Sequence, residues 1–214
     1  MRSNWIRAWL AAVAVLVGAA VLVRDRVSWL LTVEEPVLDW LLDDTDTSRW
    51  DAVQIVSDST LLVIATIILV VIGLIFDWRI SAAVVITTII GTVATQVVQG
   101  IVARTSPNGE LAVGSFPSLE VTQTGVFWGL LVMMCWWLKL PKLVWTILAE
   151  VGVALTIAVS IRQILNGEIW PSDAVGSGIV IALSLITAAL VFESNPVEFP
   201  WKRAVRNNEQ AFTS

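Results

Sequence analysis

Long apolar stretches that are almost free of charged residues alternate along this chain with short polar segments. Each stretch is close to the roughly 20 residues that a helix needs to cross a bilayer core about 30 Å thick. The pattern predicts an all-α polytopic membrane bundle of six transmembrane helices, forming a single membrane domain over residues 1–214. The expected spans are residues 8–25, 56–76, 80–103, 121–138, 143–163 and 173–192.

Composition supports a membrane protein and narrows its chemistry. Apolar residues make up 57% of the 214 residues and charged residues 14%, about half the share of a typical soluble domain. The chain has no His, the residue type that most often serves as general base or as metal ligand. We therefore expect no metal site and no cofactor, and the absence of a basic patch argues against a nucleic-acid partner.

The distribution of Lys and Arg predicts the orientation of the bundle. Eight of the 13 basic residues fall on the side that carries both termini, which is the cytoplasmic side under the positive-inside rule. The outer loops are then residues 26–55, 104–120 and 164–172, and residues 193–214 form a cytoplasmic tail. The first span begins like a secretory signal, but Arg24 and Arg26 directly after it favour a retained helix. Short loops without an Asn-x-Ser/Thr site favour a prokaryotic plasma membrane.

The first outer loop contains a further predicted helix. Val33, Val37, Trp40 and Leu41 recur at helical spacing, and acidic residues occupy the other faces. This pattern predicts an amphipathic helix on the outer surface, with Pro36 in its first turn.

The other two outer loops carry three short motifs. The first two motifs lie at residues 99–120, at the end of the third span and in the loop that follows it. Gln99 is followed after six residues by Ser106-Pro107, and then comes the run Ser115-Phe116-Pro117-Ser118-Leu119-Glu120. The second loop reads Arg162-Gln163, three further residues, and then Gly167-Glu168-Ile169-Trp170-Pro171-Ser172-Asp173. In spacing and in the retained Pro, Ser, Gly, Trp and Asp residues, these segments resemble the signature motifs of the type-2 phosphatidic acid phosphatase superfamily. Those proteins are integral-membrane lipid phosphate phosphatases, and the resemblance covers roughly residues 30 to 192.

Most of the residues that carry the family's chemistry are replaced. In the family register, Gln99 stands at the Lys position, Ser106 and Gln163 at the two Arg positions, and Glu120 and Ile169 at the two His positions. Pro107, Ser118 and Asp173 are retained, and of the chemical positions only Asp173 keeps its residue type. The resemblance thus implies the phosphatase fold with vestigial site positions, and no catalytic residue is expected.

Loss of these residues removes both the phosphate-binding charge and the nucleophile. Phosphoryl transfer needs cations that neutralise the equatorial oxygens and a group aligned for attack. The remaining cations are Arg104 and Arg162, which are outnumbered by nearby carboxylates. A shifted site is an open alternative, in which Glu120 acts as general acid while the two arginines contact an anion. Asp173 equally suits a structural role as a helix cap.

Two features within the spans add further expectations. Glu150 is a carboxyl inside the fifth span, where charge is costly and indicates function by default. It is either part of a proton or ion path, or a structural carboxyl that bonds to Ser184 or Thr187 or to a partner subunit. Four glycines are expected to allow close helix packing, namely Gly125, Gly129, Gly176 and Gly178.

The sequence therefore favours a pseudo-phosphatase that acts as an accessory or scaffolding subunit of a membrane complex. Its expected partners are membrane lipids and another integral membrane protein or complex. One alternative is a lipid-binding or lipid-handling protein that uses the vestigial substrate cleft. A second alternative is an active lipid phosphate or isoprenyl pyrophosphate phosphatase with an atypical site.

Overall fold

A computed structural model describes residues 2–24, 28–42, 50–109 and 114–193 of the chain. These residues form eight helices: α1 (Arg2–Arg24), α2 (Ser28–Leu42), α3 (Asp51–Ser57), α4 (Ser59–Phe76), α5 (Trp78–Val102), α6 (Leu119–Trp137), α7 (Lys142–Leu165) and α8 (Pro171–Glu193). Six of them, α1 and α4 to α8, are long and apolar enough to cross a membrane. The predicted all-α polytopic bundle of six spans is thereby confirmed.

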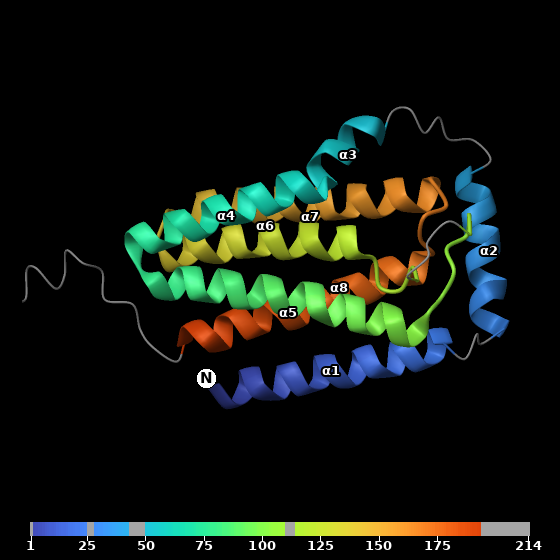
Figure 1. Cartoon of the computed structure of the whole chain (residues 1–214), viewed down its shortest axis with the longest axis horizontal. Coiled ribbons are helices and arrows are strands. Elements are labelled where there is room, and N and C mark those ends of the chain that lie inside the picture. Colours follow the sequence, from blue (N-terminus) through green and yellow to red (C-terminus); the bar gives the residue numbers. More distant parts are fainter. Residues whose placement is uncertain (1, 25–27, 43–49, 110–113, 194–214) are drawn as a thin grey trace, which may run out of the picture.

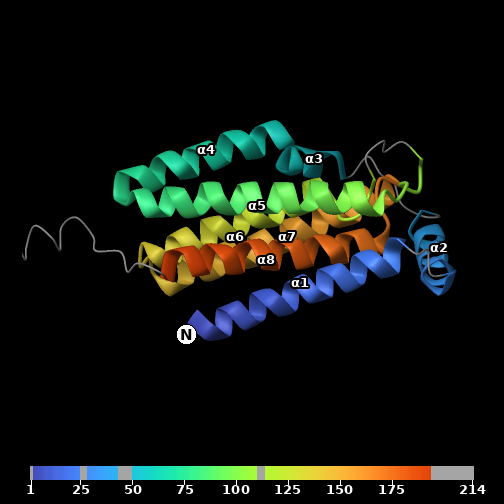
Figure 2. The same cartoon turned by 60° about the horizontal axis from the view of Figure 1, so that its bottom comes forward.

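The six long helices lie side by side along the long axis of the molecule, and α2 crosses one end of the bundle (Figure 1). α8 packs against α1, α5 and α6, and α6 packs in turn against α7. The start of α1 and the end of α8 lie at the end opposite α2, so the two termini of the bundle share one side (Figure 1). After rotation, α4 and α1 again lie at opposite edges of the bundle (Figure 2). Which of the two sides is cytoplasmic stays a prediction.

Aspartate caps determine where two of the spans begin. The carboxylate of Asp58 accepts hydrogen bonds from the backbone N–H groups of Thr60 and Leu61 at the start of α4, and Asp77 does the same for Arg79 at the start of α5. Such caps satisfy the free donors of the first helical turn. The break at Asp58 makes α3 a separate short helix, so the span expected at residues 56–76 begins at Ser59. The bounds of the other spans differ from those expected by a few residues.

The apolar core lies where α4, α5, α6 and α8 meet, around the fully buried Ala83, Val84, Leu130 and Ala188. Glycines allow close approach here. A Cβ atom on Gly125, Gly129 or Gly176 would lie 2.3–2.5 Å from side chains of the neighbouring elements. Gly178 was expected to act in the same way, which is wrong, because a Cβ there would meet no atom within 4 Å.

The predicted surface helix exists as α2, but two of the four apolar residues expected to recur on one face, Val33 and Val37, are not buried; the side chains of the other two, Trp40 and Leu41, lie outside the described part of the structure. Val33 and Val37 are exposed, whereas Glu34 and Leu38 are buried. Pro36 lies in the middle of the helix and not in its first turn, because α2 already begins at Ser28. The side chain turned toward the bundle is therefore a carboxylate, and its partners explain why.

Candidate functional site

The motif positions converge at the end of the bundle that α2 covers (Figure 1). Gln99 lies in the last turn of α5, Ser118 caps α6, Gln163 lies in the last turn of α7 and Asp173 lies in the first turn of α8. All four side chains are buried. The structure thus brings together residues from two loops that are far apart in the sequence, as the motif register requires.

Neutral hydrogen bonds occupy the inner part of this site. The Ser118 hydroxyl donates to Oε1 of Gln163 at 2.6 Å, and the Gln99 amide donates to the carbonyl oxygen of Pro117 at 2.8 Å. The Ser118 carbonyl accepts from the hydroxyls of Thr122 and Ser177. These buried groups satisfy one another, as buried polar groups in stable proteins do.

The outer part of the site is a buried ion-pair network centred on Arg104. One guanidinium nitrogen lies 2.6 Å from Oε2 of Glu34, and the other lies 3.1 Å from Oδ1 of Asp173 and 2.7 Å from the hydroxyl of Ser172. The guanidinium also lies 4.8 Å from the ring centre of Trp170, a cation–π distance. Arg104, one of the two expected anion contacts, is therefore held by two carboxylates from the protein itself.

Asp173 has a second, structural task at the start of α8. Its Oδ2 accepts a hydrogen bond from the backbone N–H of Trp170 at 2.8 Å, the arrangement of a capping box. The backbone N–H of Ser172 donates to Oε1 of Glu34 at 2.9 Å. Glu34 therefore contacts both Arg104 and the first turn of α8, which fastens α2 over the site.

Arg162, the other expected anion contact, is buried and weakly paired. Its guanidinium lies 3.7 Å from a carboxylate oxygen of Glu120 and 3.8 Å from one of Glu168. Within the described residues, its buried Nη1 has no hydrogen-bond partner. Two carboxylates surround one cation here as well, so an added phosphate dianion would meet net negative charge.

Ile169, which the motif register sets at one of the two His positions, is 2% exposed and belongs to an apolar cluster. The cluster also contains Leu38 of α2, Val121 of α6 and Val159 of α7. α2 thus covers the site with an apolar contact at Leu38 as well as with the carboxylate of Glu34. The surroundings of Ile169 are therefore hydrocarbon that excludes water.

Ser106 and Pro107 lie in a turn that joins the two loops. The Ser106 hydroxyl donates to the side-chain oxygen of Asn108 at 2.7 Å, and the backbone N–H of Asn108 donates to the carbonyl of Gly167 at 3.0 Å. Gly167 has φ +65°, a left-handed conformation that favours glycine. These contacts hold the two loops together. Ser106 itself carries no charge that could bind an anion.

Glu150 lies away from this site, on α7, and its side chain is exposed. The hydrogen bonds expected with Ser184 or Thr187 are wrong, because those hydroxyls donate to backbone carbonyls of their own helix. The proton-path and partner-subunit interpretations of Glu150 stay predictions. Among the residues that the structure describes, no group of three or more His, Cys, Asp and Glu side chains could hold a metal ion.

Glu34 and Trp170 are the contributors that the sequence did not identify as site residues. Glu34 was placed on the solvent face of an amphipathic helix, since Glu is seldom buried without a partner. No spacing rule links it to Arg104, 70 residues further along the chain. Trp170 was recognised only as part of a motif.

Comparison with solved structures identifies the architecture. A crystal structure described as the first transmembrane PAP2 type phosphatidylglycerolphosphate phosphatase from Bacillus subtilis superposes with a TM-score of 0.71, covering 86% of this chain and 93% of that one. The chain has the PAP2 phosphatase fold. Sequence identity is only 12%, so the likeness extends to the fold and not to the activity. No protein-family model and no curated protein matches the sequence.

Proposed function

We propose that this chain is a degenerate PAP2 protein that does not hydrolyse phosphate esters and acts as an accessory or scaffolding subunit of a membrane complex. The observation that carries the proposal is the occupation of Arg104 by Glu34 and Asp173. A substrate phosphate would have to displace two buried carboxylates, one of which also caps α8.

The chemistry of phosphoryl transfer supports this proposal. Catalysis of that reaction is mostly positioning plus stabilisation of charge on the transferred phosphoryl group. Gln99 and Gln163 are neutral and engaged in hydrogen bonds to the protein. Ile169 offers no electron pair for nucleophilic attack. Glu120 lies beside Arg162, but a carboxylate there adds negative charge where phosphate needs positive charge.

Contacts across the site and exposed apolar surfaces support a role in binding lipids or membrane proteins. Contacts of Glu34 and Leu38 connect α2 across the site to Arg104 after α5, to Val159 of α7 and to the start of α8. A bundle fastened in this way suits a subunit whose task is to present surfaces to lipids and to other membrane proteins. Its broad exposed apolar flanks include Ile75 at 72% and Leu143 at 70% relative exposure, as expected for surfaces in contact with lipid or protein.

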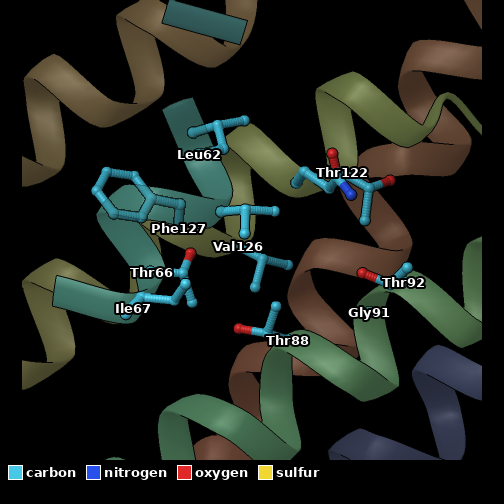
Figure 3. A pocket seen from close by; sticks show the side chains of 11 residues that line it. Leu62, Thr66, Ile67, Thr88, Gly91, Thr92, Thr122, Val126 and Phe127 are labelled. Atoms are coloured by element: carbon cyan, nitrogen blue, oxygen red, sulfur yellow. The ribbon is translucent and has the colours of Figure 1, made fainter. Parts of the chain in front are cut away.

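A lipid-binding role is the second candidate, favoured by one cavity. A space of about 140 Å³ lies between α4, α5 and α6 (Figure 3). Its lining is mainly apolar, with Leu62, Val126 and Phe127 beside Thr88, whose hydroxyl has no partner among the described residues. Thr122 lines the cavity and also bonds to Ser118, so the cavity adjoins the site. An acyl chain fits such a lining, with Thr88 available to a lipid oxygen.

Purification in a mild detergent, followed by mass spectrometry of the intact assembly, separates the two candidates. A stoichiometric second protein supports the accessory subunit, whereas a retained lipid without a protein partner supports the lipid binder. Thr88→Leu fills the cavity and is expected to expel such a lipid, and so is Thr92→Leu, because both side chains line the cavity and both are partly buried. An active phosphatase with an atypical site, the third possibility, is tested by phosphate release.

A further inference from the structure

Apart from Arg24 and Lys142, which stand at the ends of their helices, two exposed charged side chains lie within the candidate spans of α1 and α7 without a partner among the described residues. Arg7 lies in the candidate span of α1 and Glu150 in that of α7, and both are exposed. Neither takes part in a hydrogen bond or ion pair with another residue that the structure describes. A lone ionisable residue within a span is costly, and its usual explanation is a functional partner.

On α1, Arg7 points away from the bundle. Leu16 is 6% exposed and lies on the packed face of α1, which contacts α8 and α5. Arg7 precedes Leu16 by nine residues, which is two and a half turns at about 3.6 residues per turn and therefore the opposite face. It begins an exposed stripe that continues through Leu10, Val17 and Val21.

Glu150 has the corresponding position on α7. Val159 is fully buried, and Glu150 precedes it by the same nine residues, so it too points away from the bundle. Its stripe contains the exposed Leu143, Ile147 and Ile157. One turn after each charge lies an exposed alanine, Ala11 on α1 and Ala154 on α7, small enough to let two helix backbones approach.

The two charges lie at nearly the same depth. A series of contacts runs across the bundle from α1 to α7 and relates their depths. Trp9 of α1 donates to Thr187 of α8, a Cβ on Gly129 of α6 would meet Leu185 of α8, and a Cβ on Gly152 of α7 would meet Trp128 of α6. Arg7 lies two residues before Trp9, where this series begins, and Glu150 lies two residues before Gly152, where it ends. α1 and α7 run in the same direction (Figure 1). The offset is about three residues, or ~4.5 Å at 1.5 Å per residue, which an extended arginine side chain spans.

We propose that the chain associates with a second copy of itself, the α1 flank of one copy packing on the α7 flank of the next, with Arg7 paired to Glu150. Charge complementarity selects this occupant, because one copy supplies both the cation and the anion at matching depth. α8 and α6 lie between α1 and α7, so a single chain does not form this pair internally. The contact is head-to-tail and generates a ring or a row of copies. The proposal does not depend on whether the site hydrolyses phosphate.

Charge reversal in the full-length chain tests this interface. The chain is reconstituted in lipid nanodiscs or a mild detergent, and its association state is measured by sedimentation and native mass spectrometry. Wild type self-associates, and Arg7→Glu or Glu150→Arg alone weakens association about three- to thirty-fold, the range for polar contacts between membrane helices. An equimolar mixture of the two variants associates again, since each variant then meets the opposite charge on its neighbour. The double variant does so on its own.

Arg24→Glu is the matched control, an exposed arginine reversed at the other end of the same helix, and it leaves association unchanged. Circular dichroism confirms that each variant retains its helices. A monomeric wild type overturns the proposal, as does self-association that neither reversal weakens, or failure of the folded variants to associate when mixed. Because the purified chain is used alone, these outcomes are independent of any second protein and of phosphatase activity.

Discussion

Glu34 and Arg104, separated by 70 residues in the chain, form a buried ion pair whose charged atoms lie 2.6 Å apart. Their side chains are 4% and 9% exposed. The pair connects the surface helix α2 to the loop after α5, and through Ser172 to the start of α8. Arg104, which the sequence offered as an anion contact, is thereby used to hold α2 and the start of α8 together.

Removal of Arg104 is expected to be strongly destabilising. Arg104→Met leaves Glu34 and Asp173 buried without a cation, and breaking a buried pair by removing one partner costs about 3–5 kcal/mol. Thermal unfolding in a mild detergent measures the loss. Glu35→Gln is the control, because Glu35 is an exposed neighbour on α2, and its unfolding temperature should match wild type. An Arg104→Met protein as stable as wild type would show that the network does not hold α2 in place.

Introducing an imidazole at Ile169 is expected to weaken the fold and not to create a catalyst. In Ile169→His the ring enters an apolar cluster, where an unpaired polar group costs about 1–3 kcal/mol. Ile169→Val, which removes one methylene, should cost about 0.5–1.5 kcal/mol. Both are compared by thermal unfolding and by phosphate release. Activity gained by Ile169→His alone would mean that Arg104 and Arg162 already suffice to bind phosphate.

The hydrogen bond between Ser118 and Gln163 is expected to give a measurable coupling. Gln163→Leu leaves the Ser118 hydroxyl without its acceptor, at a cost of about 1–3 kcal/mol, while Ser118→Ala removes the donor. The double variant should be less destabilised than the sum of the two, because residues in direct contact are not additive. Strict additivity in denaturant or thermal unfolding would argue that the bond at 2.6 Å contributes nothing.

Two glycines in α8 are expected to respond oppositely to alanine. In Gly176→Ala the new Cβ would lie 2.5 Å from the ring of Phe116, a side chain that is 1% exposed, so the substitution lowers the unfolding temperature. In Gly178→Ala the new Cβ meets open space, and the better helix propensity of Ala stabilises by up to about 1 kcal/mol. Equal responses would contradict the packing described for the start of α8.

Much of the fold could be predicted from the sequence, since the length and spacing of apolar stretches are set by the bilayer. The register of the motifs also placed Gln99, Ser118, Gln163 and Asp173 at one end of the bundle. The second span was expected from residue 56, three residues before α4 begins at Ser59. Span lengths taken from hydropathy do not place a helix start to the residue, which here is fixed by the cap at Asp58.

The contacts within the site could be predicted only in part. The sequence indicated excess carboxylates around Arg104 and Arg162, and the structure identifies Glu34 as one that the pattern missed. A buried carboxylate on an amphipathic helix has no local signature, because its partner lies on another element. Glu150 was recognised as unusual, but the direction of its side chain depends on how α7 packs against α6. That packing could not be predicted from the sequence.

Phosphate release from a lipid phosphate decides whether this site hydrolyses phosphate esters. Purified full-length chain is incubated with phosphatidic acid and with phosphatidylglycerolphosphate in mixed micelles, beside Glu120→Gln and a protein-free control. The account predicts the same rate in all three samples. Release by wild type above the protein-free control, abolished by Glu120→Gln, would contradict it and would show that Glu120 takes part in an active site.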